Sequence, residues 1–232
     1  MKLLALDTSS DACTVAVVNG EATASRHAEA AREHTRTLMP MIREAMDEAA
    51  LGFDDLDAVV LGNGPGSFIG MRIAAAVTQG IAYAAKLPVV PVSSMAALAM
   101  QVLEEEPGDV AAIAQDAHMQ EVYFGLYAKT GDGLVTPIGE ERLASQAPLP
   151  ELLELGGGRA VAAGRGWRLY PELLAANRAA ISAESERMVP DARYVLALGK
   201  AAFARGESLD PVDVNPAYLR QKVAAVLAPK SP

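Results

Sequence analysis

The sequence predicts an α/β protein built from two similar βββαβα modules. The order of elements in the first half, three strands and then alternating helices and strands, returns in the second half without sequence identity. Hydrophobic residues make up 51% of the 232 residues, which is enough to form a packed core. Each half is too small to cover both faces of its own sheet, so we expect the halves to pack together around a ligand cleft. A single open α/β sheet is the alternative.

Hydrophobic periodicity defines the elements of the first half. Three strands are expected in KLLALD, TVAVVNG and EATASRHA, and Asn19-Gly20 marks the tight turn of an antiparallel meander. The remaining elements are a helix over 34–50, a strand in DAVVLG, the loop NGPGSFIG, a helix over 71–86, a strand in PVVPV and a helix over 94–103.

The acidic segment EEEPGD, residues 104–109, predicts a boundary between an N-terminal module, 1–105, and a C-terminal module, 106–232. Beyond it we expect strands in AAIAQD, EVYFGLYA and LVTPIGEERL, a short helix in LPELLEL, a strand in RAVAAG, and helices in WRLYPELLAAN and DARYVLALGKAAFARG. The closing segment PAYLRQKVA either docks elsewhere or packs back on the first module.

Charge and composition exclude several classes of protein. The 20 basic and 29 acidic residues give a net charge of −9, so the chain lacks the basic surplus that direct nucleic-acid binding needs. The one cysteine, Cys13, forms no internal disulfide and is expected in the core. Asp7 ends the first apolar run too early for a signal peptide, and Arg72, Gln79 and Lys86 interrupt the longest one. We therefore expect a cytoplasmic protein that spans no membrane.

The loop NGPGSFIG joins a buried strand to a helix, an arrangement that suits anion binding. Gly64, Gly66 and Gly70 keep side chains away, and the first helical turn offers free N–H groups to a phosphate or carboxylate. The alternative is a tight turn in which Ser67 caps the helix. The loop lacks the lysine of a P-loop and the GxSxG pattern of a hydrolase.

Polar residues directly after the first strand are a second candidate. Asp7 could hold a hydrated cation, and the Thr8 and Ser9 hydroxyls could face a phosphate, or the three could cap a turn. With the glycine loop they form the candidate nucleotide or anion site: Asp7, Thr8, Ser9, Gly64, Gly66 and Ser67. His27, His34 and His118 lie at spacings that do not suggest a zinc site.

Two helices of the first half offer more apolar surface than one core contact needs. On the first, the apolar arc covers about half of the circumference. The second carries Ala76, Gly80 and Ala84 four residues apart, which would let another helix approach closely, although packing inside the domain would use the same pattern. The predicted partner interface is Leu38, Met41, Ile42, Ala45, Met46, Arg72, Ile73, Ala76, Val77, Gly80 and Tyr83.

An ordered set of motifs resembles one known family nearly end to end. The motifs are LALDTSSDACTVAVV, REHTRTLMPMI, GPGSFIGMRIA, PVVPVSSMAAL, DAHMQEVYFGLY and PAYLRQKVA. Together they resemble the TsaB family, also called YeaZ, of bacterial proteins required to make threonylcarbamoyladenosine on tRNA. The resemblance implies an actin-like fold of the sugar kinase and Hsp70 ATPase class, with two βββαβα modules.

The resemblance also implies a role. Proteins of this family are expected to be non-catalytic partners of TsaD, which transfers a threonylcarbamoyl group to the adenosine next to the anticodon of tRNAs that read ANN codons. Pairing with TsaD, or between two copies as a homodimer, is expected through the first two helices in a four-helix bundle. The ATPase TsaE is expected to dock on the TsaB–TsaD pair, and tRNA is expected to be held indirectly. No cofactor is required, apart from a weak ATP or ADP contact in the complex.

The resemblance further implies that no metal is bound. Where TsaD carries HMEGH, this chain reads SMAAL, so Ser94 and Leu98 stand in place of two histidine ligands. The chain departs from the family pattern at Ile69, Ala74 and His118, where the family usually has threonine, glycine and arginine. The competing hypothesis is an independent enzyme, either an actin-like ATPase that uses Asp7 and the glycine loop or a peptidase.

Overall fold

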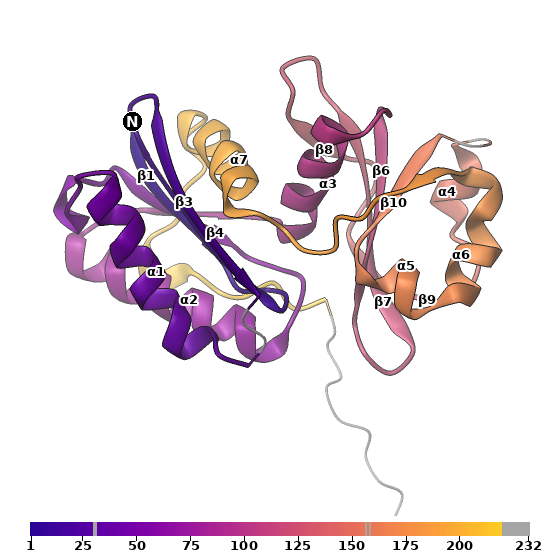
Figure 1. Ribbon diagram of the computed structural model, residues 1–232, viewed down its shortest axis with the longest axis horizontal. Helices are drawn as coiled ribbons and strands as arrows, with labels where there is room; N and C mark the ends of the chain where they lie inside the picture. The colour runs from indigo at the N-terminus through magenta and orange to yellow at the C-terminus, as the bar shows by residue number, and fades with distance from the viewer. Residues whose placement is uncertain (30–31, 156, 158, 220–232) are drawn as a thin grey trace, which may run out of the picture.

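The computed structural model describes residues 1–29, 32–155, 157 and 159–219. Two β-sheets with their helices lie side by side along the long axis of the molecule (Figure 1). The N-terminal sheet has five strands and the C-terminal sheet has six. This arrangement agrees with the two-module prediction and not with a single open sheet.

The N-terminal sheet has the strand order β3-β2-β1-β4-β5. β1, β2 and β3 form an antiparallel meander, whereas β4 and β5 run parallel to β1. Both faces are covered, because the side chains of β1 alternate between two separate cores, Leu4 and Leu6 in one and Leu3 and Ala5 in the other. The elements are β1 (Lys2–Asp7), β2 (Ala12–Asn19), β3 (Ala22–Glu29), α1 (His34–Glu48), η1 (Phe53–Asp55), β4 (Ala58–Gly62), α2 (Phe68–Ala85), β5 (Val89–Val92) and α3 (Ser94–Glu105).

The C-terminal sheet repeats this topology in the order β11-β10-β6-β7-β8, and β9 also pairs with β7. β6 and β7 are antiparallel, and β10 and β11 run parallel to β6. The elements are β6 (Val110–Asp116), β7 (Glu121–Lys129), β8 (Val135–Pro137), β9 (Arg142–Ser145), α4 (Pro150–Glu154), β10 (Ala160–Ala163), α5 (Arg165–Leu169), α6 (Pro171–Asn177), η2 (Arg178–Ala180), β11 (Ile181–Glu184), α7 (Ala192–Ala204) and η3 (Pro211–Asp213).

Three details of the second half differ from the prediction. The segment LVTPIGEERL forms two strands, β8 and β9, instead of one. The segment WRLYPELLAAN forms two helices, because Pro171 has no N–H to continue α5 and begins α6. The edge strand β11 was not predicted, since in its four residues only Ile181 is buried.

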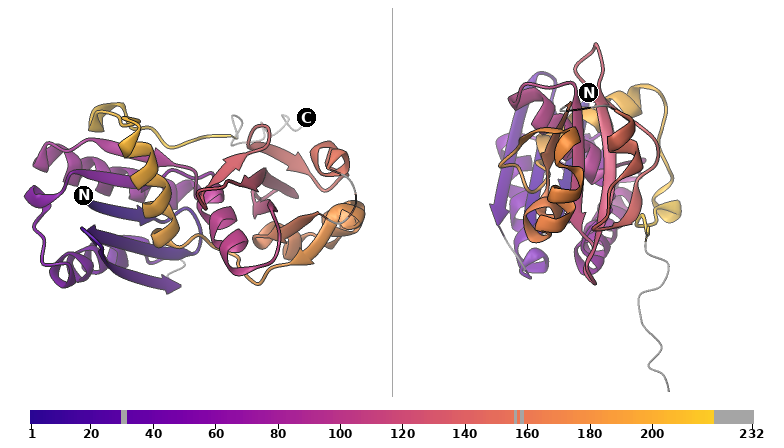
Figure 2. Two further views of the ribbon diagram at one scale, coloured as in Figure 1. Left: turned by 90° about the horizontal axis from the view of Figure 1, so that it is seen from above. Right: turned by 90° about the vertical axis from the view of Figure 1, so that its right-hand side faces the viewer.

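The last helix of each half packs on the sheet of the other half. α3 contacts β6, β7 and β10, whereas α7 lies across β1, β2 and β4, as the crossing helix in Figure 2 shows. A glycine allows this close approach of α7, because a Cβ at Gly199 would lie 2.2 Å from Cγ1 of Val60. Packing therefore crosses the expected boundary at residues 105 and 106 in both directions, and the division there remains a prediction.

Residues 206–219, which we call the C-terminal strap, run from α7 along the N-terminal module. Val89 and Leu209 exchange backbone hydrogen bonds of 2.8 and 2.9 Å at the free edge of β5. The Gln79 amide donates to the carbonyls of Pro211 and Val214, and Val214 is buried in the core. The strap is thus held along α2 and ends near its N-terminus. The last part of the motif PAYLRQKVA, residues 220–224, lies outside the described residues.

Among the described residues, α2 alone has the length and apolar composition of a membrane span. A core helix passes the same test, so one such helix is weak evidence. In this fold Ala74, Ala75 and Ala82 of α2 are buried against the sheet and α1.

Candidate functional site

Turns from both modules meet at a cleft between the two sheets. The turn after β1, the glycine loop after β4 and the turn between β6 and β7 line a cavity of about 170 Å³. One ion pair crosses the cleft, between the Arg165 guanidinium at the start of α5 and the Asp11 carboxylate beside β2. The candidate nucleotide or anion residues lie on the N-terminal side of this cleft.

The carboxylate of Asp7 is buried and accepts hydrogen bonds from within the chain. One oxygen accepts from the Ser9 N–H at 2.7 Å, and the other accepts from the Ser94 hydroxyl at 2.5 Å. Complete burial raises the pKa of the Asp7 carboxyl above its usual value, although the hydrogen bonds from Ser94 and Ser9 oppose the shift. Because both oxygens have partners and no solvent reaches them, Asp7 does not fit the role of a cation ligand.

The glycines of the loop allow the backbone to pack on the turn after β1. A Cβ at Gly66 would lie 2.1 Å from the Ser9 carbonyl oxygen, and one at Gly70 would lie 1.9 Å from that of Thr8. Thr8 donates its hydroxyl to the Gly70 carbonyl at 2.7 Å. Close approach of two chain segments therefore explains these glycines.

The N–H groups of the loop mostly have partners within the chain. The Gly64 N–H donates to the Ser94 hydroxyl at 2.9 Å, and the Ser67 N–H donates to the Ser9 carbonyl at 2.7 Å. The Ser67 hydroxyl caps α2 by accepting from the Gly70 N–H. These contacts form the tight turn in which Ser67 caps the helix, and anion binding at the loop stays a prediction.

Ser94 and Leu98, which the resemblance to TsaD sets against two histidines, are both buried in the first half of α3. Ser94 joins Asp7 to the glycine loop, and Leu98 packs in a core with Ile113 and Tyr127. In the part of the chain that the structure describes, no group of three or more histidine, cysteine, aspartate or glutamate side chains is arranged to hold a metal ion. Cys13 is buried, as expected.

The predicted interface on α1 is corrected by the structure. Five side chains proposed to meet a partner are buried in the N-terminal core, where the sheet covers one side of the helix and α2 covers the other. They are Leu38, Met41, Ile42, Ala45 and Met46. The exposed side of α1 is largely charged, and Arg26 of β3 bonds both Glu44 and Glu48 there. The wide apolar arc therefore serves two contacts within the chain.

The predicted interface on α2 lies at the surface. Arg72, Ala76, Gly80 and Tyr83 are exposed, and Ile73 and Val77 are half-buried. At about 100° per residue these six positions fall on one side of the helix, and we call them the α2 face. The Tyr83 side chain is 73% exposed, and among residues 1–29, 32–155, 157 and 159–219 no neighbouring segment lies within 4 Å of the Cβ position of Gly80.

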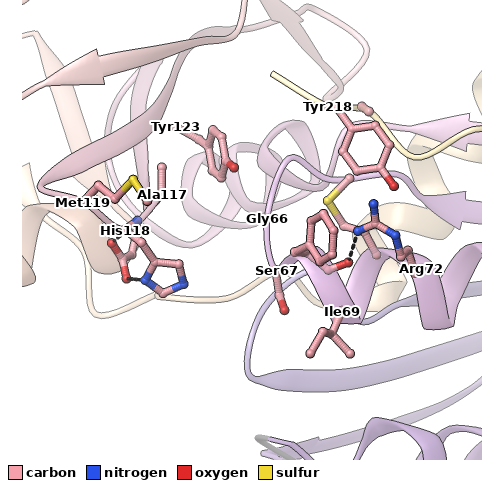
Figure 3. Close-up of a pocket in the computed structure, with 13 residues that line it drawn as sticks. Gly66, Ser67, Ile69, Arg72, Ala117, His118, Met119, Tyr123 and Tyr218 are labelled. Carbon is pink, nitrogen blue, oxygen red and sulfur yellow. Dashed lines mark hydrogen bonds and ion pairs between the residues drawn. The ribbon is translucent and has the colours of Figure 1, made fainter. Parts of the chain in front are cut away.

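A larger groove, which we call the inter-module groove, opens beside the N-terminus of α2 (Figure 3). Its cavity volume is about 670 Å³, and its walls come from the first turn of α2, the β6–β7 turn and the end of the strap. The Arg72 guanidinium lies 3.3 Å from the ring centre of Phe68 and 4.9 Å from that of Tyr218. Across the groove, Met119 projects from a turn in which residues 118–120 all have positive φ.

Sequence reasoning did not identify this groove. Its exposed apolar residues come from three segments that are far apart in the chain, so no local spacing links Phe68, Met119 and Tyr218. The left-handed turn at His118, Met119 and Gln120 also contains no glycine to mark it.

Two linked modules with the same mixed sheet, each a meander of three antiparallel strands followed by two parallel strands, define the actin-like class of the sugar kinases and Hsp70 ATPases.

The family model of TsaD, tRNA N6-adenosine threonylcarbamoyltransferase, matches residues 20–163. The TsaB proteins of Haemophilus influenzae and Escherichia coli, both named for tRNA threonylcarbamoyladenosine biosynthesis, are 34% and 33% identical to this chain. These matches cover 96% of this chain and 95% of the first relative, and 97% of this chain and 96% of the second.

The structure of YeaZ from Pseudomonas aeruginosa superposes with a TM-score of 0.85 at 34% sequence identity. That match covers 94% of this chain and 99% of the other. The chain therefore belongs to the TsaB (YeaZ) family of tRNA threonylcarbamoyladenosine biosynthesis proteins, as the sequence motifs predicted.

Proposed function

We propose that this protein is a non-catalytic partner subunit of TsaD in the complex that transfers a threonylcarbamoyl group to the adenosine next to the anticodon. The observation that carries the proposal is the α2 face, an outward helical surface with a glycine near its middle. The same face would serve a homodimer when TsaD is absent, so TsaD and a second copy would compete for it.

Gly80 is the strongest support for contact at this face. A glycine inside a helix costs roughly 0.5–1 kcal/mol relative to alanine. At Gly199 a close neighbour in the same chain explains the glycine, whereas at Gly80 no described residue outside the same stretch of α2 lies within 4 Å of the Cβ position. A helix from another molecule that approaches the backbone here would account for it, with Ala76 on the preceding turn extending the flat surface.

The chemistry of the face suits a protein partner. Ile73 and Val77 are only half-covered by their own chain, and Tyr83 presents an aromatic ring to solvent. Arg72, at one end, is held by the Phe68 carbonyl at 2.7 Å and is therefore already ordered for contact. Because the apolar residues of α1 are in the core, we propose that α1 contributes to a helical bundle through its exposed side only.

The buried state of Asp7 supports a non-catalytic role. Kinases and ATPases need an accessible carboxylate for their metal or base, and the carboxylate nearest to the glycine loop is sealed by Ser94. Ser94 and Leu98 also stand where the resemblance to TsaD places two metal-binding histidines. We propose that the chain needs no metal or cofactor of its own, and that any ATP or ADP contact forms only in the complex.

The net charge of the chain bears on how tRNA would be held. With 29 acidic and 20 basic residues the chain has no surplus to neutralise phosphates, so we propose that tRNA is held mainly by TsaD. The ATPase TsaE would dock on the assembled pair. Because the proposed substrate is tRNA, we propose a cytoplasmic location.

The test is binding to TsaD by a variant of an exposed α2 residue. Ala76→Arg places a charged side chain on the α2 face without touching the core, and we expect at least a tenfold rise in the Kd measured by titration calorimetry. Ala175→Arg, at an exposed alanine of α6, is the matched control and should bind normally. Equal affinity of both variants would reject the interface. ATP turnover by the chain alone, lost in Asp7→Ala, would instead favour an independent ATPase.

A further inference from the structure

The inter-module groove gathers exposed apolar side chains in a way that the rest of the described surface does not. Ten large hydrophobic residues in the part of the chain seen in the structure are markedly exposed, and four of them line this groove. Phe68, Ile69, Met119 and Tyr218 are each between 47% and 68% exposed. A groove of about 670 Å³ lies in the size range of pockets that bury a ligand or a short peptide (about 300–1,000 Å³). A concave site lined mainly by apolar and aromatic side chains is typical of ligand and peptide binding sites.

The path of the chain indicates what fills it. The strap places Ala217 and Tyr218 in the wall of the groove, and the described chain ends one residue later, at Leu219. Thirteen more residues follow, with the sequence RQKVAAVLAPKSP. We propose that this tail, residues 220–232, binds in the inter-module groove of its own chain.

The composition of the tail fits the walls of the groove. Its central part, VAAVLA, offers six small or medium apolar side chains to a site lined by aromatic rings, methionine and isoleucine. Figure 3 shows Met119 and Tyr123 on one side of the groove and Tyr218 and Arg72 on the other. An apolar segment between these walls would cover exposed apolar surface, which is favourable by about 25 cal/mol per Å² of apolar area.

Charge favours the same occupant. The tail holds three of the 20 basic residues and none of the 29 acidic residues, so the rest of the chain has 17 basic residues against 29 acidic ones. A carboxylate stands in the groove wall at Asp116, with its side chain 23% exposed. Lysine or arginine residues that flank VAAVLA would therefore meet an acidic body and at least one acidic group at the groove itself.

Because the tail is covalently attached to the strap, a low intrinsic affinity is enough for it to occupy the groove. The strap is fixed by the backbone pair of Val89 and Leu209, by the Gln79 amide, and by the contact of Tyr218 with Arg72. The tail thus starts from a fixed point on the groove wall, and a short connection of this kind gives an effective concentration in the mM range. An intrinsic Kd of about 1 mM is then enough to fill the groove much of the time.

This inference does not depend on the proposed function. Arg72 belongs to both the groove wall and the α2 face, so an occupied groove would extend the apolar surface of that face. Tail binding is nevertheless a property of the isolated chain and can be measured without TsaD.

The test attaches a spin label to Cys in a Lys230→Cys variant of the full chain and records methionine methyl signals by NMR. Cys13 is buried, so the label reaches the new thiol. We expect strong broadening of the Met119 and Met71 methyls, which line the groove, and little of Met1 and Met46, which lie at the far ends of β1 and α1.

Two further variants make the result specific. Ile69→Lys places a positive charge in the groove wall and should remove most of the Met119 broadening, whereas Tyr83→Lys, exposed on the same helix but outside the groove, should leave it unchanged. Broadening spread over all surface methyls, or unaffected by Ile69→Lys, would overturn the proposal. Broadening that arises when spin-labelled chains are mixed with separate isotope-labelled chains would show that a second copy fills the groove, and would overturn it too.

Discussion

Replacement of Gly80 should raise the stability of the isolated chain and lower its affinity for the proposed partner. The residue lies within α2, its surface is exposed, and in the part of the chain that the structure describes no other segment comes within 4 Å of the position that a Cβ would take. A Cβ added at this position therefore meets no described neighbour in the isolated chain. Alanine and leucine both favour the helix, whereas both would fill the space that the proposed partner helix needs.

The expected gain in stability follows from helix propensity. Alanine is better than glycine in a helix interior by about 0.8–1 kcal/mol, and leucine by nearly as much. For a protein of 150–250 residues, 1 kcal/mol raises the Tm by about 2–4 °C. Gly80→Ala and Gly80→Leu should each give a shift of this size, while the leucine variant loses at least tenfold in affinity for TsaD.

The assay combines thermal unfolding with calorimetric titration of TsaD. Because self-association would make the Tm depend on concentration, unfolding is followed at several dilutions down to a constant value. Ala175→Leu on α6 is the control, since it adds the same kind of side chain at another exposed helix position.

Two results would refute the reasoning. A lower Tm in Gly80→Ala would mean that the glycine has a role within the chain. Normal TsaD binding by Gly80→Leu would mean that the glycine is not in the interface. A protein that is more stable yet binds less well would exclude misfolding as the cause.

Three further predictions concern the core of the cleft. Burial raises the pKa of Asp7, so the folded chain keeps this proton to higher pH than the unfolded chain does, and stability falls as pH rises from about 4 through the folded pKa. We therefore expect the unfolding free energy of the wild type, measured by urea titration, to fall relative to that of Asp7→Asn as the pH is raised from about 4.5 to 8. A difference between the two proteins that does not change with pH would contradict this. Gly70→Ala should destabilise by about 1–3 kcal/mol or more, because its Cβ would meet the Thr8 carbonyl, and an unchanged urea midpoint would refute the contact. Ser93→Ala removes the acceptor for two N–H groups of α3 and a partner of Glu141, and should cost about 1–2 kcal/mol in the same assay; no loss would show that the cap is dispensable.

The repeated topology was readable from the sequence because most of its strands are long buried runs. β1, β4 and β10 contain almost only apolar residues, since helices cover both faces of each sheet. β11 has only one buried residue in four, so its pattern could not be distinguished from a loop. The exchange of α3 and α7 between sheets is also absent from any local pattern, because a helix carries no sign of which sheet it will cover.

The two helices of the predicted interface show that periodicity does not decide whether an apolar helix surface is buried or exposed. α1 and α2 both have a wide apolar surface in the sequence, yet the structure buries Ile42 completely and leaves Ala76 exposed. The periodicity of a helix shows how much of its surface is apolar. Only the tertiary structure shows whether that surface is buried by the same chain or left exposed. Gly80 is the more informative residue, because it is an exposed helical glycine and no described segment of the chain approaches its Cβ position.

The start of α3 joins the two modules through two adjacent serines. Ser93 caps the helix and bonds Glu141 of the second module, where Tyr127 bonds the same carboxylate at 2.5 Å. Ser94 bonds Asp7 and the glycine loop of the first module. The turn of helix that the resemblance aligns with a metal site in TsaD is thus occupied by structural hydrogen bonds. Histidines placed at Ser94 and Leu98 would have to displace these bonds and the packed Leu98 side chain before any ion could be held there.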